Sequence, residues 1–264
     1  MATRSDRASG SKPSSRLPHD YRRKLASHQF KRIAEARCAV GHDGLRPITS
    51  ERIPNSLKES HVLVTTTPVA LPAAVRWHGR GGQGVVTASR LLAAAALEGG
   101  YYPQSLPDFG AERSGAPVAA YTRIDDQPPS VRGPVESPGL VLVLDPSLIG
   151  NVDVLEGMAP GSAVVVNSIR SPEDEQKRLV RDDVVICTVD ATAISLELIG
   201  RALPNTPMLG ALLEVFPVVN LETMVEAVRK QLRGLFPDRI VDGNIAALHR
   251  GFESAKSIAQ GGAQ

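Results

Sequence analysis

The residues whose chemistry is most evident form a glycine-rich segment near position 80. Gly79, Gly81 and Gly84 satisfy the pattern G-x-G-x-x-G. Glycines permit a tight turn and let backbone amides approach a phosphate, and the N-terminal end of a following helix attracts the anion. The apolar segment from Val75 and the Ala- and Leu-rich segment 85–97 are typical of a strand and a helix on either side. The turn is therefore predicted to hold a phosphorylated ligand or, alternatively, only to permit close packing of the helix on the sheet.

A standard dinucleotide site fits this segment poorly. Such sites usually carry an acidic residue at the end of the second strand, where it binds the ribose. The predicted second strand is 101–106, and the nearest acids are Glu98, inside the preceding helix, and Asp108, beyond a proline. A P-loop is excluded because no Gly-Lys-Ser/Thr follows the glycines. The sequence thus favours a phosphate-bearing ligand without supporting the usual nicotinamide or flavin assignment.

The segments around the turn alternate between short apolar strands and helices. Unalternated apolar strands mixed with helices are typical of a parallel sheet that is covered on both faces. Residues 118–124, followed by Asp-Asp-Gln-Pro, instead predict a hairpin arm. We therefore predict an α/β, Rossmann-like fold with a mostly parallel mixed sheet, helices on both faces and an irregular N-terminal extension. The other predicted strands are 140–144, 162–167 and 184–189, and the other predicted helices are 193–199, 221–232 with Asn220 as N-cap, 242–256 and one from about Pro207.

The first 73 residues differ in charge from the rest of the 264-residue chain. They contain 13 lysines and arginines against 6 acidic residues, whereas the remainder has 17 against 22. A basic segment on an acidic body indicates a nucleic acid, membrane surface or acidic subunit as partner, or else a solvated extension. Residues 1–18 are predicted to be disordered, 19–40 to form a short amphipathic helix and 41–72 to form a proline-punctuated connector. We expect residues 1–73 to wrap a partner and residues 74–258 to fold as one domain.

Composition excludes several classes of protein. Only 4% of the residues are aromatic, which argues against nucleic-acid modules that stack bases on exposed rings. Cys38 and Cys187 lie far apart and outside any Cys-x-x-Cys pair, so neither an iron–sulfur cluster, another metal site nor a disulfide framework is predicted in this chain. No apolar run reaches the roughly 18 residues of a membrane span, and the N-terminus lacks the apolar core of a secretory signal. We expect a cytoplasmic protein.

Five motifs follow one another along the chain: His78–Val85, Phe109–Val118, Tyr121–Asp125, Thr188–Thr192 and Asn205–Ala211. In this order they resemble the gamma subunit of the 2-oxoacid:ferredoxin oxidoreductases, the pyruvate synthase family. The resemblance covers roughly Ala74 to Ala255, and five ordered motifs are far more specific than the glycine turn alone. The first 73 residues lie outside it.

The resemblance implies a subunit of an enzyme that oxidatively decarboxylates a 2-oxoacid to an acyl-CoA and passes the electrons to ferredoxin. Thiamine diphosphate with Mg and the iron–sulfur clusters would reside in the alpha, beta and ferredoxin-like delta subunits, and none in this chain alone. The gamma component would help to hold coenzyme A, in a site shared with its partners, and to assemble the complex. Pyruvate, 2-oxoglutarate, branched-chain and aromatic oxoacids all remain open as substrates, because the substrate pocket would lie mostly in other chains.

The same resemblance assigns candidate cofactor-binding residues by position. Arg113 would pair with a phosphate through its guanidinium fork or, alternatively, form an intersubunit salt bridge. Asn205 and Thr206 belong to the motif Asn205–Ala211, but we favour the interpretation that they cap the helix beginning near Pro207. His78 is interpreted as structural, and no general base or nucleophile is assigned. The candidate cofactor-binding residues are Gly79, Arg80, Gly81, Gly82, Gln83 and Gly84 in the glycine turn and Arg113, Ser114 and Gly115 in the second loop.

A second hypothesis belongs to a different class. The chain would be a free-standing nucleotide-binding module whose basic arm binds nucleic acid or a membrane. Such a protein would be a colourless monomer whose binding to DNA depends strongly on salt. A subunit of the complex would instead purify with larger thiamine- and cluster-containing chains.

Overall fold

A computed structural model describes residues 69–108, 115–129 and 133–258. The predicted helix at 19–40 and the candidate residues Arg113 and Ser114 lie outside the described residues. The description therefore concerns the domain that follows the basic segment.

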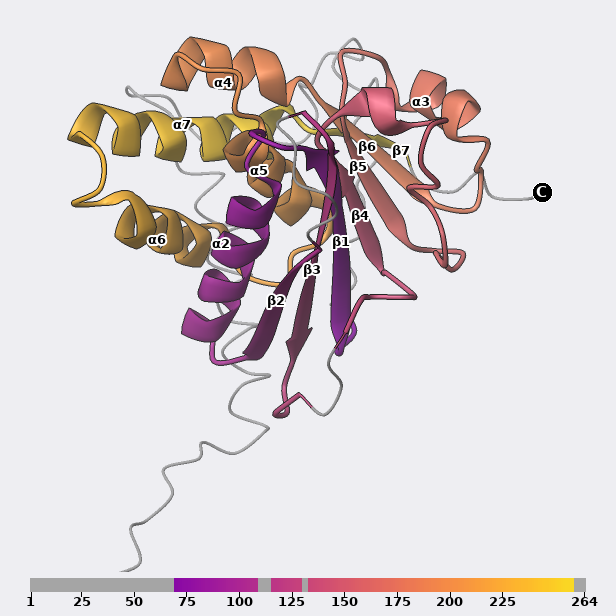
Figure 1. The fold of residues 1–264 in the computed structure, drawn as a ribbon, viewed down its shortest axis with the longest axis horizontal. Coiled ribbons are helices and arrows are strands. Elements are labelled where there is room, and N and C mark those ends of the chain that lie inside the picture. Colours follow the sequence, from indigo (N-terminus) through magenta and orange to yellow (C-terminus); the bar gives the residue numbers. More distant parts are fainter. Residues whose placement is uncertain (1–68, 109–114, 130–132, 259–264) are drawn as a thin grey trace, which may run out of the picture. The chain divides into compact units, whose positions relative to one another are not determined.

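The centre of this domain is a seven-stranded mixed sheet (Figure 1). In chain order its strands are β1 (Ala73–Arg80), β2 (Tyr102–Asp108), β3 (Pro117–Asp125), β4 (Leu140–Val143), β5 (Ala163–Asn167), β6 (Val185–Val189) and β7 (Lys256–Ile258). The spatial order is β2-β3-β1-β4-β5-β6-β7. Strands β1, β4, β5 and β6 run parallel, while β3 is antiparallel to both β1 and β2, and β7 is antiparallel to β6. The predicted mixed, mostly parallel sheet is confirmed.

Six α-helices and one short 3-10 helix surround the sheet in the described part of the chain. They are α2 (Val85–Glu98), the 3-10 helix η2 (Pro146–Leu148), α3 (Pro172–Leu179), α4 (Ala191–Ile199), α5 (Asn205–Val215), α6 (Leu221–Leu232) and α7 (Asp238–Ser254). Helices α2 and α5 contact one face of the sheet directly, and α4, α6 and α7 lie outside them, whereas α3 covers the other face near β6 (Figure 1). Helices therefore lie on both faces, as predicted.

The central strands are apolar on both sides because both faces of the sheet are covered. In β4, Leu140 and Leu142 point into the core beneath α2 and α5, while Val141 and Val143 point into a smaller core that includes Leu179 of α3. Every residue of β4 and β5 is buried. This two-sided burial explains why their sequences lack the alternation of a half-exposed strand.

One helix was missed, and α4, α5 and α7 begin two to four residues earlier than predicted. Helix α3 was not predicted, although Ser171 accepts a hydrogen bond from the amide of Asp174 and thus caps a strongly charged helix with few apolar residues. Helix α7 begins at Asp238, four residues before the predicted start. Helix α5 begins at Asn205 rather than near Pro207. Pro237 and Pro204 occupy the preceding N-cap positions, where the missing amide hydrogen of proline costs nothing.

Two glycines set the close crossing of α5 and α7. A Cβ atom at Gly210 would lie 2.1 Å from the carbonyl oxygen of Leu248, and one at Gly251 would lie 2.1 Å from the carbonyl oxygen of Pro207. Backbone therefore meets backbone at this crossing, and any side chain would force the helices apart. The crossing fixes the position of the first turn of α5, which borders the site described below.

Among the described residues, no helix has both the length and the apolar character required to cross a membrane.

Candidate phosphate-binding site

The glycine turn follows β1 directly and leads into α2. Gly82 (φ +97°) and Gly84 (φ +82°) occupy the left-handed region of backbone space, which side chains disfavour. A Cβ atom at Gly79 would lie 2.5 Å from Cγ2 of Val85, and one at Gly84 would lie 2.7 Å from Cγ of Asn205. Close packing thus requires glycine at positions 79 and 84. At Gly82 the space is open, since a Cβ atom there would meet nothing within 4 Å, so only the backbone conformation requires glycine.

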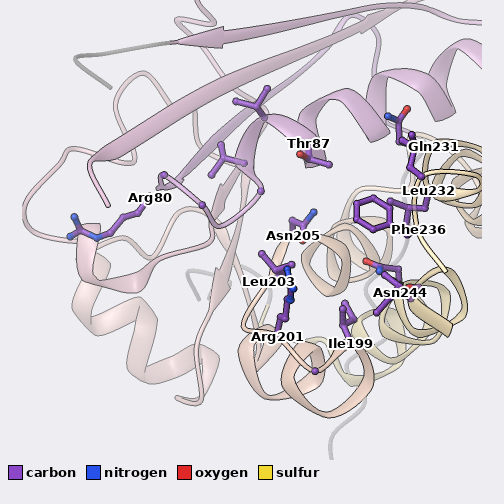
Figure 2. A pocket seen from close by; sticks show the side chains of 18 of the residues that line it. Arg80, Thr87, Ile199, Arg201, Leu203, Asn205, Gln231, Leu232, Phe236 and Asn244 are labelled. Carbon is purple, nitrogen blue, oxygen red and sulfur yellow. Dashed lines mark hydrogen bonds between the residues drawn. The ribbon is translucent and has the colours of Figure 1, made fainter. Parts of the chain in front are cut away.

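Side chains behind the turn hold it to the neighbouring strand. Oε1 of Gln83 accepts a hydrogen bond from the amide of Arg80 at 2.8 Å, and its Nε2 donates to Oδ2 of Asp145 at 2.9 Å. Nε of Arg80 lies 3.2 Å from the same carboxylate oxygen, and the guanidinium also donates to Ser147 and to the carbonyl of Gly115. Figure 2 shows the Arg80 side chain directed away from the pocket. Gln83 and Arg80 therefore shape the turn through internal bonds.

The carboxylate of Asp145 is charged at neutral pH. Burial alone raises its pKa, but hydrogen bonds from Ser147 and Gln83 and the charge of Arg80 outweigh burial and leave the pKa below its usual value. The charged form is the one that accepts bonds from Gln83 and attracts Arg80. The turn is thus anchored on a carboxylate that lies behind it.

The front of the turn presents backbone donors. Within the described residues, the amides of Gly82, Gly84 and Val85 have no hydrogen-bond acceptor, and α2 has no side-chain cap. The first turn of α2 contains no acidic residue either. Free amides at a helix start carry a partial positive charge, so this end of α2 favours an anion.

Gly82, Gly84 and Val85, which carry these amides, line a cavity of about 1230 Å³. Leu235 and Phe236 form an apolar rim between α6 and α7, and Arg201 and Arg239 add two exposed cations that have no salt-bridge partner within the described ranges. Figure 2 shows Asn205 between the glycine turn and Leu203, with Phe236 and Asn244 on the opposite wall. The cavity therefore combines anion-binding donors at one end with apolar surface at the other.

The structure separates the candidate residues into three groups. Arg80, Gly81, Gly82 and Gly84 line the cavity. Gly79, Gln83 and Gly115 do not line it, and the first two support the turn from behind. Arg113 and Ser114 lie outside the described residues. The cavity is also lined by residues that were not predicted from the sequence: Thr87, Arg201, Leu235, Phe236, Arg239 and Asn244.

The interpretation of Asn205 and Thr206 as helix caps is wrong. Asn205 is the first residue of α5 rather than its cap, and the structure shows no side-chain hydrogen bond to the helix start. Thr206 donates from Oγ1 to Oδ1 of Asn244 at 2.8 Å, which ties α5 to α7. The N-cap position of α5 is occupied by Pro204, whose apolar side chain cannot accept a hydrogen bond from the helix start.

Two potentially reactive side chains play no part in this cavity. His78 is buried, and burial, with a smaller effect of Arg76, lowers its pKa to about 4 despite the opposing charge of Asp153. Burial raises the pKa of the Cys187 thiol to about 12, so it remains protonated. Neither lines the cavity. Across the described ranges, no group of three or more His, Cys, Asp or Glu side chains is arranged to hold a metal ion.

A parallel strand, a glycine turn and a helix with free N-terminal amides form an α/β arrangement that commonly binds phosphate groups. Residues 74–254 match the family model described as pyruvate ferredoxin/flavodoxin oxidoreductase, and the chain belongs to this family.

Named relatives agree with this membership. The pyruvate synthase subunit PorC of Thermotoga maritima is 44% identical over 182 residues, which are 69% of this chain and 94% of the relative. The pyruvate/ketoisovalerate oxidoreductases common subunit gamma of Thermococcus kodakarensis is 44% identical over 165 residues, 62% of this chain and 89% of the relative. These relatives are gamma-type subunits of 2-oxoacid oxidoreductase complexes.

Solved structures share the fold. The crystal structure of the pyruvate oxidoreductase subunit PORC from Thermotoga maritima matches with a TM-score of 0.63 at 42% identity, over 70% of this chain and 97% of the other. The 2-oxoglutarate:ferredoxin oxidoreductase from Magnetococcus marinus matches with a TM-score of 0.57 at 18% identity, over 72% of this chain and 32% of the other, and supports the fold alone.

Proposed function

We propose that this chain is the gamma component of a cytoplasmic 2-oxoacid:ferredoxin oxidoreductase and that its cavity helps to hold coenzyme A. Family membership supports the first part of the proposal. The free amides of Gly82, Gly84 and Val85 at the start of α2 are the single observation that carries the second part.

The residues present fit coenzyme A. Its pyrophosphate matches the uncapped start of α2, because backbone amides and the helix dipole both favour negative charge there. Its pantetheine arm matches the apolar rim formed by Leu235 and Phe236. Arg201 and Arg239 would attract the remaining phosphate. The cavity is open, so other subunits would complete the site.

The chain's own part in the reaction is to bind and orient. Coenzyme A, when bound, would supply the thiol that takes up the acyl group. The turn anchored by Asp145 would hold its pyrophosphate. We assign no proton transfer to this chain, since neither His78 nor Cys187 borders the cavity. Thiamine diphosphate with Mg and the iron–sulfur clusters belong to the alpha, beta and delta subunits in this proposal.

Replacement of Gly82 by Asp in the assembled complex tests the coenzyme A site. The carboxylate would project into the amide-lined turn and repel the pyrophosphate, so the KM for coenzyme A is expected to rise by on the order of tenfold to a hundredfold while the KM for the oxoacid stays unchanged. Gly150→Asp is the matched control, because Gly150 also has a positive φ (+91°), a Cβ atom there would meet nothing within 4 Å, and it lies outside the cavity. Equal effects of the two variants on the KM for coenzyme A would overturn the assignment.

Purification from the native source tests the subunit assignment. We expect a brown preparation that contains larger thiamine- and cluster-binding chains and reduces ferredoxin with an oxoacid and coenzyme A. A colourless monomer that binds DNA in a strongly salt-dependent manner would contradict the assignment and favour the free-standing nucleotide-binding module.

Residues 1–73 would contribute to assembly in this proposal. Their excess of basic residues would favour an acidic surface on a neighbouring subunit. Deletion of residues 1–60 should therefore shift the complex to smaller species in size-exclusion chromatography. An intact assembly after the deletion would rule out this role.

A further inference from the structure

Asn205 is the one asparagine of the cavity whose carboxamide has no hydrogen-bond partner within the described residues. It is 8% exposed, and it borders the cavity beside the glycine turn (Figure 2). Asn244, the other asparagine there, accepts from Thr206 and donates to the carbonyl of Ile240. The polar atoms of the Asn205 carboxamide are not among the buried side-chain atoms without a partner, so they are accessible from the cavity, where a ligand can supply the missing hydrogen-bond partner.

The carboxamide lies where two helix starts converge. A Cβ atom at Gly84, the residue before α2, would be 2.8 Å from Nδ2 of Asn205, the first residue of α5. Neither helix has a side-chain cap or an acidic residue in its first turn. Helices α3, α4 and α6, by contrast, are capped by Ser171, Asp190 and Asn220. Two positive helix ends and an unpartnered amide therefore meet at one point of the cavity.

We propose that Asn205 binds the pyrophosphate of the ligand, donating a hydrogen bond from its carboxamide while the starts of α2 and α5 lie on either side of the anion. This inference rests on the proposed coenzyme A site and adds to it a residue and a second helix. Gly84 is then required for two reasons, since its lack of a side chain both allows the turn and leaves room for the Asn205 carboxamide.

Replacement of Asn205 by Asp separates binding from folding. The two side chains have nearly the same shape, but the carboxylate cannot donate and would repel the anion. A negative charge in the first turn of α5 stabilises that helix through its dipole. The unliganded full-length chain should therefore keep or raise its Tm, while its affinity for coenzyme A falls. Most side-chain changes that weaken binding by distorting the fold would instead lower both the Tm and the affinity for coenzyme A.

The measurement is the thermal shift of the full chain, with and without coenzyme A, followed by titration calorimetry. Binding to the folded state raises the Tm by mass action, and this rise should disappear in Asn205→Asp, with the Kd increased by on the order of tenfold to a hundredfold. Inorganic pyrophosphate, used as a second probe, should lose its binding in parallel. Gln231→Glu is the control, because it adds the same charge to the cavity wall at an exposed position of α6, away from the two helix starts. This variant should change the Kd by roughly threefold at most.

The outcomes distinguish the two proposals. If the wild-type chain and the assembled complex both fail to bind coenzyme A, the proposed function is overturned, and the role of Asn205 with it. If the wild type binds and Asn205→Asp binds equally well, the coenzyme A site stands and the role of Asn205 is overturned. A fall in the Tm of unliganded Asn205→Asp that matches the loss of binding would show that Asn205 supports the fold rather than the ligand.

Discussion

Two cavities in the described part of this domain lie near the ends of the parallel strands, and their polar groups differ in one respect. The first contains the glycine turn and Asn205. The second, of about 430 Å³, lies at the ends of β5 and β6 and contains Asn167, Glu175 and Arg178. In the second cavity these groups bond to one another or to nearby backbone. In the first, the amides of Gly82, Gly84 and Val85 and the carboxamide of Asn205 have no partner within the described residues.

The two asparagines make the contrast explicit. Nδ2 of Asn167 donates to the carbonyl of Leu144 at 2.9 Å and to Oγ1 of Thr192 at 2.8 Å, and its Oδ1 accepts from the amide of Thr192 at 3.2 Å. Glu175, whose side chain is fully buried, accepts from Ser168 and Arg178. A saturated network of this kind holds β4, β5 and α4 together and leaves little for a ligand to satisfy.

The comparison shows that cavity position alone does not identify a ligand site. Both cavities lie where α/β sheets commonly bind ligands. Only the first combines free backbone amides, two uncapped helix starts and a carboxamide without a partner in the described ranges. The following changes test whether that distinction is functional.

Gly84→Ala should have the largest effect. The new side chain would adopt φ +82° and lie 2.7 Å from Cγ of Asn205, so the free energy of unfolding should fall by roughly 3–5 kcal/mol and coenzyme A binding should be lost. Gly100→Ala has nearly the same φ (+84°) with nothing within 4 Å, and it should cost only about 1–2 kcal/mol and retain binding. Chemical denaturation and calorimetry measure both quantities. Similar losses in the two variants would show that the contact with Asn205 is unimportant.

His78 provides a test of a polar group that lies outside both cavities. Its Nε2 is buried without a partner in the described chain, and His78 borders neither cavity. Its pKa is lowered to about 4, so between pH 6.5 and 4 the unfolded chain binds more protons than the folded one. The free energy of unfolding should therefore fall by on the order of 3 kcal/mol as the pH drops through this window. His78→Phe should remove that slope. Persistence of the full slope in the variant would assign it to other groups.

Asn167→Ala should affect stability but not binding. Removal of the carboxamide leaves the carbonyl of Leu144 and the amide of Thr192 without their partners, so the free energy of unfolding should fall by roughly 1–3 kcal/mol. The Tm rise induced by coenzyme A should persist. Asn205→Ala should give the reverse, with stability nearly unchanged and the ligand-induced rise lost. The same pattern in both variants would eliminate the distinction between the two cavities.

Asp145→Asn should have the smallest effect, because it acts on the turn only through Gln83 and Arg80. Loss of this partly exposed charge weakens one ion pair and one hydrogen bond, which together contribute about 1 kcal/mol. The Kd for coenzyme A should rise by at most about fivefold, and titration calorimetry would detect it. A hundredfold loss would mean that Asp145 controls the turn far more directly than its contacts indicate.

The sequence was sufficient to predict the glycine turn and every strand of the sheet except β7, which begins at Lys256, where the last helix was expected to end. The apolar runs of β4, β5 and β6 were predicted within two residues at each end, since two-sided burial demands continuous apolar sequence. The hairpin character of 118–124 correctly indicated antiparallel β3. Helix α3 was missed because it is short and strongly charged, and it depends on its Ser171 cap and on packing against β6 rather than on an apolar stripe.

The site was less predictable, and the reason is geometric. The sequence by itself determined the family and the position of the glycine turn, because these depend on residues that are adjacent in the chain. Only the tertiary structure brought Asn205 within contact of Gly84, through the close crossing of α5 and α7 at Gly210 and Gly251. It also turned Gln83 and Arg80 away from the cavity toward Asp145. Which donors are satisfied internally, and which remain free for a ligand, depends on contacts between distant segments that no local pattern encodes.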